Sequence, residues 1–172
     1  MSTTRTPSGP QDFTREGGST MIGARLRRLS ERIDGDAGRI YAESGIAFEQ
    51  RWMAPMRLLS LHGPLSVREI AAALGISHAS VSQARLSLHK ARLISWTTDP
   101  TDARSRKLHL TASGRRMVER LAPIWSALMA AAIELDAEAE GTVAALERLD
   151  RALQRSSLYD RASAHLRRQT RA

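Results

Sequence analysis

Residues 65–83 read LSVREIAAALGISHASVSQ, and they carry the clearest structural signal in the sequence. Ser66 is followed three residues later by Glu69, which is the pairing of a capping box at the start of a helix. Gly75 stands where helices commonly end in a left-handed residue. The stretch therefore predicts a helix over residues 67–74 that ends in a glycine turn.

A second helix is predicted over residues 78–91, because Ser77 can cap its first turn. Its start is polar and uncharged, and such side chains can hydrogen-bond to base edges and phosphates. Two helices joined in this way are typical of a helix-turn-helix, whose second helix enters the DNA major groove. The alternative is a helical hairpin without a DNA contact. The candidate DNA-binding residues of this unit are Ser66, Arg68, Ser77, His78, Ser80, Ser82 and Gln83.

A β-hairpin is predicted next, because residues 93–97 and 107–111 alternate apolar and polar side chains as half-buried strands do. The segment between them is polar and basic. Arginines on a loop beside a recognition helix suit narrow minor grooves, which attract them. The alternative is a solvated charged loop. The candidate DNA contacts of the hairpin are Asp102, Arg104 and Arg106.

Residues 65–77, 81–83, 99–104 and 108–115 together resemble the MarR family of bacterial transcription regulators. Most of this resemblance comes from an Asp-Pro-x-Asp-x-Arg wing followed by Leu-x-Leu-Thr-x-x-Gly. Residues 48–52 are similar to MarR-type domains that are fused to N-acetyltransferases. The resemblance implies a homodimer formed by the first and the last two helices, a pseudo-palindromic operator, and release by a small organic ligand, aromatic or anionic. In the family pattern, the order of Arg85 and Leu86 is unusual, and Arg92 replaces a frequent glycine.

Long apolar stripes flank this unit, at helical spacing over residues 22–40, 121–135 and 143–153. They are too long for one small core, so we expect intersubunit surfaces. The fold class is therefore mainly α with a small β-hairpin wing, a winged helix-turn-helix flanked by long dimerisation helices. The expected organisation is a disordered tail over residues 1–20, a MarR-type domain over 21–160 with its winged core at about 60–116 and dimerisation helices at about 21–44 and 112–160, and a basic C-terminal tail over 161–172.

The charge is unevenly spread in a chain of 172 residues with a net charge of +8. Residues 60–116 hold nine Lys and Arg against three acids, an excess of six positive charges, whereas residues 117–160 hold four Arg against eight acids. A basic region beside an acidic one favours a single face that binds a polyanion. The alternative is a merely solvated basic surface.

The residue types give little support for a metal site or an enzyme active site. The chain has no cysteine, which excludes disulfides and thiolate metal sites, and its five histidines have no acids at metal-ligand spacing. No glycine-rich phosphate loop or nucleophile elbow occurs. We therefore expect no enzyme activity, no metal and no cofactor. Without an apolar run of membrane-spanning length or a signal peptide, we expect a cytoplasmic protein.

A ligand pocket is a further hypothesis, because aromatic and Met side chains with one Arg can hold an organic anion. The alternative is ordinary core and interface packing. The candidate ligand-binding residues are Tyr41, Trp52, Met56, Arg57 and Trp125.

The sequence thus predicts a dimeric, sequence-specific regulator that binds double-stranded DNA and acts as a repressor. One alternative is a protein-interaction module that keeps the fold and lacks specific DNA recognition. Another is a partner of a separately encoded acetyltransferase.

Overall fold

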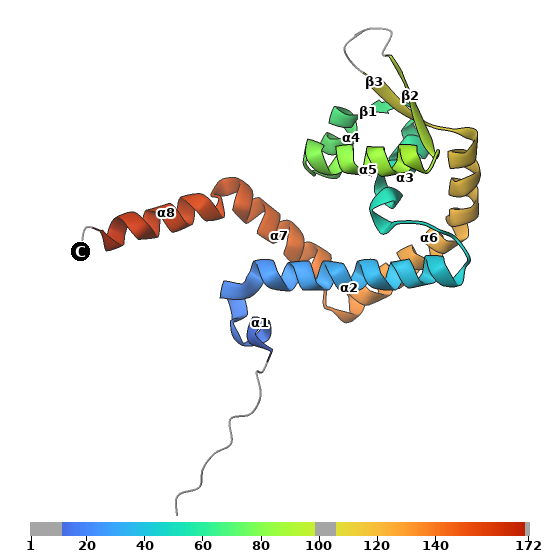
Figure 1. Cartoon of the computed structure of the whole chain (residues 1–172). Coiled ribbons are helices and arrows are strands. Elements are labelled where there is room, and N and C mark those ends of the chain that lie inside the picture. The colour runs from blue at the N-terminus through green and yellow to red at the C-terminus, as the bar shows by residue number, and fades with distance from the viewer. Residues whose placement is uncertain (1–11, 99–105, 171–172) are drawn as a thin grey trace, which may run out of the picture. The chain divides into compact units, whose positions relative to one another are not determined.

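The computed structural model describes residues 12–98 and 106–170 (Figure 1). The described residues up to Ile124 form one compact unit, and those from Trp125 onward form a second. The first unit contains α1 (Phe13–Glu16), η1 (Gly18–Met21), α2 (Ile22–Glu43), η2 (Gln50–Trp52), α3 (Met53–His62), β1 (Leu65–Ser66), α4 (Val67–Leu74), α5 (His78–Lys90), β2 (Ile94–Thr98), β3 (Arg106–Leu110) and the start of α6 (Ala112–Glu138). The second contains the rest of α6, α7 (Thr142–Arg155) and α8 (Leu158–Gln169).

The predicted winged helix-turn-helix is confirmed in the first unit. Helices α4 and α5 pack on each other, and the three short strands form an antiparallel sheet in the order β1-β3-β2. Leu108 in β3 pairs with Leu65 on one side and with Trp96 on the other. The sheet therefore ties the start of α4 to the β2–β3 wing, which extends beyond the helices in Figure 1.

The core of this unit is aliphatic, as expected for a chain with 4% aromatic residues. The side chains of Ile70, Val81 and Leu88 are almost fully buried on the facing sides of α4 and α5. Ile94 in β2 and Leu121 in α6 are equally buried. Burial of such side chains supplies most of the free energy that holds α5 in place.

Helix ends follow the local signals closely. Gly75 has φ +63° and closes α4 in the left-handed conformation. The Thr111 hydroxyl accepts a hydrogen bond from the Gly114 amide at 3.0 Å and so caps α6. Pro55 lies in the first turn of α3, where its missing N–H costs no helical hydrogen bond.

The N-terminal segment differs from the expected disordered tail over residues 1–20. Residues 1–11 lie outside the described part of the chain, but α1 and η1 form between Phe13 and Met21. Asp12 caps α1 through the Arg15 amide and binds Arg28 of α2 with both carboxylate oxygens, at 2.8 and 2.7 Å. This long-range ion pair gives the segment a tertiary anchor that composition did not indicate.

The C-terminal region also differs from the expected basic tail over residues 161–172, because most of these residues belong to α8. The helix breaks between α7 and α8 at Ser156, which is extended. Ser157 and Asp160 form a capping box that starts α8. The basic residues at 167 and 168 lie in the last turn of α8, where positive charge is favourable.

Several helices expose large apolar side chains, as the stripes predicted. On α2 these are Ile22, Leu26, Leu29, Ile33 and Ile40, and in the second unit they include Ile133, Val143, Leu146 and Leu153. None of the helices in the described ranges combines the length and the apolar character that crossing a membrane requires.

Candidate nucleic-acid interface

The start of α5 presents a polar surface. The Ser77 hydroxyl accepts a hydrogen bond from the Ser80 amide at 3.1 Å, and the two serine hydroxyls lie 2.9 Å apart. His78 and Gln83 are exposed, whereas Ser82 is half-buried. The cap therefore fixes the first turn of the helix and leaves His78 and Gln83 free to meet a partner.

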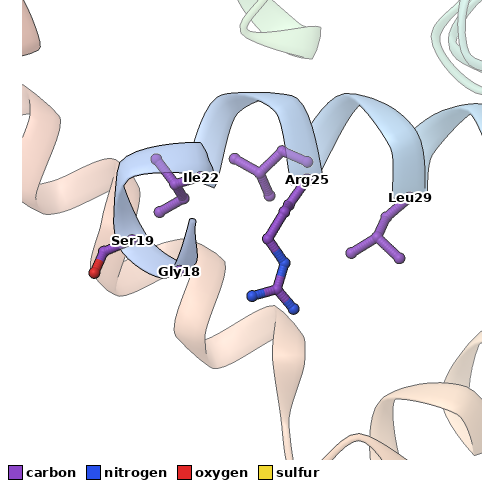
Figure 2. Close-up of a pocket in the computed structure, with 6 residues that line it drawn as sticks. Gly18, Ser19, Ile22, Arg25 and Leu29 are labelled. Atoms are coloured by element: carbon purple, nitrogen blue, oxygen red, sulfur yellow. The ribbon is translucent and has the colours of Figure 1, made fainter. Parts of the chain in front are cut away.

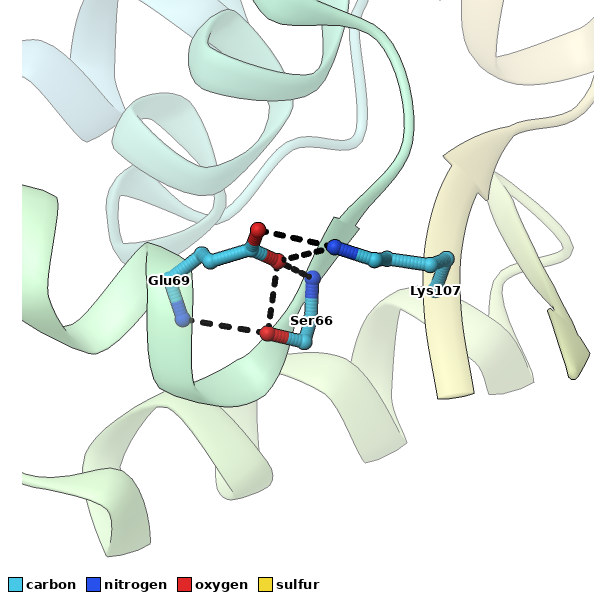
Figure 3. Close-up of polar contacts among 3 residues, drawn as sticks. All are labelled: Ser66, Glu69 and Lys107. Carbon is cyan, nitrogen blue, oxygen red and sulfur yellow. Dashed lines mark hydrogen bonds and ion pairs between the residues drawn. The ribbon is translucent and has the colours of Figure 1, made fainter. Parts of the chain in front are cut away.

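The beginning of α4 is joined to the wing by a polar cluster (Figure 3). The Lys107 ammonium of β3 lies 2.7 Å from both carboxylate oxygens of Glu69. The Ser66 amide and hydroxyl both donate to Glu69 at 2.7 Å, and the Ser66 hydroxyl accepts from the Glu69 amide at 3.2 Å. Hydrogen bonds from Lys107, then those from Ser66, lower the pKa of Glu69 from 4.5 to about 2.

This cluster assigns a structural task to a candidate DNA contact. The Ser66 hydroxyl both donates to and accepts from Glu69, so its single hydrogen is already used within the protein. Arg68, one position before Glu69, is exposed in the first turn of α4. The sequence did not indicate the bond between Lys107 and Glu69, because these residues are 38 positions apart in the chain.

Aromatic and basic side chains meet where the wing joins α5. The guanidinium carbons of Arg85 in α5 and Arg106 in β3 lie 5.6 and 5.7 Å from the ring centroid of Trp96 in β2. The His89 ring lies against the same indole, with centroids 4.3 Å apart. The structure thus explains the unusual order at positions 85 and 86: Arg85 reaches the wing, while Leu86 is 59% exposed.

The turn between α5 and β2 sets the position of the wing. Arg92 has φ +59°, so it occupies the left-handed site where the family pattern often has glycine. Its carbonyl accepts a hydrogen bond from the Thr111 hydroxyl at 2.7 Å. Gly114 packs so tightly that a Cβ there would lie 2.0 Å from the Leu93 carbonyl oxygen. The start of α6 therefore clamps this turn.

Two of the three hairpin candidates, Asp102 and Arg104, lie outside the described residues. Arg106 is exposed at the start of β3. The structure therefore brings Arg106 next to α5, and it places His78 and Gln83 on the same helix as Arg85.

The ligand-pocket candidates of the first unit are packed against one another or close neighbours. Tyr41, Trp52 and Met56 are buried. The Tyr41 hydroxyl donates to Gln50 at 2.8 Å, and the Trp52 indole N–H donates to Ser87 at 2.7 Å. Such contacts are those of a core. Arg57 is half-buried in α3, and Trp125 belongs to the second unit.

An open depression of about 320 Å³ lies elsewhere, at the start of α2 (Figure 2). Its lining is mostly apolar and includes Gly18, Ser19, Ile22, Arg25, Leu26 and Leu29. In the described ranges, no group of three or more histidines and acids is arranged to hold a metal ion.

Part of the chain is similar in sequence to a known protein family. Residues 56–105 match the model of the MarR family. No curated protein sequence matches the chain.

One similar solved structure is that of BpsR from Bordetella bronchiseptica, which was described with the regulation of its DNA binding by 6-hydroxynicotinic acid. It is 24% identical to this chain with a TM-score of 0.63, and the match covers 83% of this chain and 98% of BpsR. The S. aureus MepR–DNA complex is 22% identical with a TM-score of 0.62, covering 77% and 98%. PcaV of Streptomyces coelicolor, in complex with its natural ligand, is 20% identical with a TM-score of 0.61, covering 81% and 95%. At these identities the structures share the fold. Residues 56–105 are thus similar in sequence to the MarR family, and the first unit shares its winged-helix fold with these solved structures.

Proposed function

We propose that this protein is a DNA-binding transcription regulator that places α5 in a major groove and the wing in a neighbouring minor groove. The observation that carries the proposal is the capped, polar start of α5 beside a basic wing strand. His78 and Gln83 are exposed there, and Gln can pair bidentately with adenine. The exposed Leu86 on the same helix suits contact with a thymine methyl group.

We further propose that the protein acts as a homodimer on a pseudo-palindromic operator, with half-sites about one helical turn, roughly 10 bp, apart. The exposed apolar rows on α2 and on the C-terminal helices support this, because such surfaces in soluble proteins commonly mark interaction sites. In this proposal α2 and α6 to α8 are the dimerisation helices. Sedimentation at micromolar concentration should give twice the monomer mass, and Ile33→Lys on α2 should shift the protein towards monomer.

We also propose that a small organic ligand, aromatic or anionic, regulates DNA binding by the protein. In this proposal the protein is a repressor that acts in a bacterial cytoplasm. The support is that fold relatives include BpsR, described with 6-hydroxynicotinic acid, and PcaV, with its natural ligand. A panel of aromatic acids added to the protein–DNA complex tests this step. Release of DNA by one of them, in parallel with a raised melting temperature of the free protein, would support it.

The decisive experiment is a pull-down of fragmented genomic DNA at two salt concentrations, followed by sequencing. We expect one inverted repeat to survive the higher salt. On that repeat, Gln83→Ala should change the base preference, whereas Arg104→Ala should weaken binding to all sequences and reduce the salt slope by about 1. Arg148→Ala, which removes an exposed charge from α7, is the matched control. Unchanged affinity of both test variants would refute the assigned roles.

A second candidate function is a protein-interaction module without specific DNA recognition. The 59% exposure of Leu86 on the outer side of α5 favours it, because a large apolar side chain there suits a protein partner as well as a base. Uniform, salt-labile recovery of genomic DNA would point to this module, since phosphate contacts alone carry no sequence information. Co-purification of an acetyltransferase would identify a partner of the class that the sequence suggested.

A further inference from the structure

We propose that Trp96 is a positioning residue that holds Arg85 and Arg106 as a paired binding site for DNA backbone phosphate, where α5 meets the wing. This inference rests on the proposed DNA-binding function and names a contact that lies between the two grooves. The ligand is the phosphodiester itself, so the site contributes affinity and register and no base preference.

The geometry starts from the sheet register. Trp96 pairs with Leu108, and Thr98 pairs with Arg106. Because side chains two residues apart in a strand share a face, Arg106 is a diagonal neighbour of Trp96, within reach of a long side chain. Lys107 lies on the opposite face of β3 and binds Glu69 instead.

Arg85 approaches the same ring from α5. The two guanidinium carbons are 5.6 and 5.7 Å from the ring centroid, within the distance of about 6 Å at which a cation is attracted by an aromatic face. His89, one helical turn further along α5, contacts the ring as well. One indole therefore gathers two positive charges from two elements that are expected to meet different grooves.

The charges of this pair are not balanced by acids in the described ranges. Four other arginines there each face a carboxylate: Arg28 with Asp12, Arg39 with Asp36, Arg51 with Glu49, and Arg151 with Glu147. The Arg85 and Arg106 guanidinium groups make no ion pair with the acids of residues 12–98 and 106–170, and each lies over the indole. The two positive charges lie close to one neutral ring and repel each other. An anion that binds both arginines would therefore stabilise the pair.

The chemistry of the guanidinium selects phosphate as that anion. A guanidinium group that lies over a ring face is attracted through its charge, and its N–H groups need not hydrogen-bond to the ring. These N–H groups therefore stay available to bind an anion. Their planar fork matches two oxygens of one phosphate. Holding both side chains on the indole before DNA arrives lowers the conformational entropy lost on binding, which is the contribution expected of a positioning residue.

The test is a mutant cycle on a 30-bp duplex of random sequence, with fluorescence anisotropy at several salt concentrations. We expect Arg85→Gln/Arg106→Gln to make the salt slope shallower by about 0.9, since the pair binds one phosphate and each neutralised phosphate contributes about 0.9. Trp96→Leu should weaken binding about three- to tenfold, as expected for loss of one to two cation–π pairs. Trp96→Phe should recover part of this loss.

The decisive comparison is Trp96→Leu in the Arg85→Gln/Arg106→Gln background, where we expect no further loss of affinity. An equal loss with and without the arginines would overturn the proposal, because Trp96 would then act through the fold alone. The control Arg148→Gln/Arg155→Gln removes the same charge from α7 and should leave the slope almost unchanged. If Trp96→Leu does not fold, the same cycle is run with Trp96→Thr, a residue suited to a strand.

This design separates the inference from the function on which it rests. A wild-type protein that binds no duplex at low salt would refute DNA binding and the phosphate site together. A wild-type protein that binds, with an unchanged slope in the double arginine variant, would refute the phosphate site and leave DNA binding intact.

Discussion

Removal of the charge on Glu69 should loosen the wing while leaving the start of α4 intact. Glu69→Gln keeps a side chain that can complete the capping box but abolishes the ion pair with Lys107. Glu69→Ala removes both interactions. The pair of variants therefore separates the connection between wing and helix from the cap of α4.

The magnitude follows from the exposure of the two partners. The side chain of Lys107 is 24% exposed and that of Glu69 is 46% exposed, so water screens much of the attraction. With two bonds of 2.7 Å to one carboxylate, the pair should contribute at the upper end of the exposed range, about 1 kcal/mol. Loss of the cap adds about 1 kcal/mol. We expect melting temperatures lower by about 2–4 °C for Glu69→Gln and by about twice that for Glu69→Ala.

The pH dependence has a definite sign. The folded-state pKa of Glu69, about 2, lies below its ordinary value of 4.5. The carboxylate therefore contributes its full stabilisation above pH 4.5, and this contribution is lost as the pH falls from 4.5 towards 2. The stability difference between wild type and Glu69→Gln should be largest near pH 7 and small near pH 2.5.

The assay is urea unfolding followed by circular dichroism at pH 7, 5, 3.5 and 2.5. Lys107→Met and the double variant Glu69→Gln/Lys107→Met complete a cycle, and their coupling free energy measures the pair itself. A wild-type advantage that stays constant across this pH range, or a coupling of zero at pH 7, would refute the reasoning.

Two further predictions concern the turn that α6 clamps. Gly114→Ala should lower the free energy of unfolding by about 3 kcal/mol, because the new Cβ would lie 2.0 Å from a backbone oxygen of Leu93. Urea unfolding measures this loss, with Ser113→Ala at a neighbouring exposed position as the control. A loss below about 0.5 kcal/mol would contradict the tight packing at Gly114. Arg92→Gly should raise the free energy of unfolding by about 0.5–1 kcal/mol in the same assay. The relief of a left-handed φ outweighs the entropy that glycine adds to the unfolded chain. A destabilised variant would instead show that the Arg92 side chain makes a compensating contact.

The sequence was informative where the signal is local. Ser66, Gly75 and Thr111 each act on backbone groups within a few residues, so the predicted ends of α4 and the start of α6 are confirmed. The break before α8 also had a local signal, because Ser157 and Asp160 have the spacing of a capping box.

Long-range pairs were beyond such reasoning. Lys107 meets Glu69 across 38 residues, and Asp12 meets Arg28 across 16. Nothing in the neighbourhood of Arg85 indicates that its side chain turns towards Trp96. Such contacts depend on how α5 and the sheet pack, so the sequence alone could not explain the unusual order of Arg85 and Leu86.

The wing strand shows how one short element serves both stability and binding. Arg106 and Lys107 are neighbours with the same charge, yet strand alternation sends Arg106 to Trp96 and Lys107 to Glu69. If the phosphate site is correct, Arg106→Gln should weaken DNA binding with little change in melting, since the side chain is exposed. Lys107→Met should lower the melting temperature and affect binding only through the position of the wing. Equal effects of both substitutions on both measurements would mean that the two faces of β3 do not act separately.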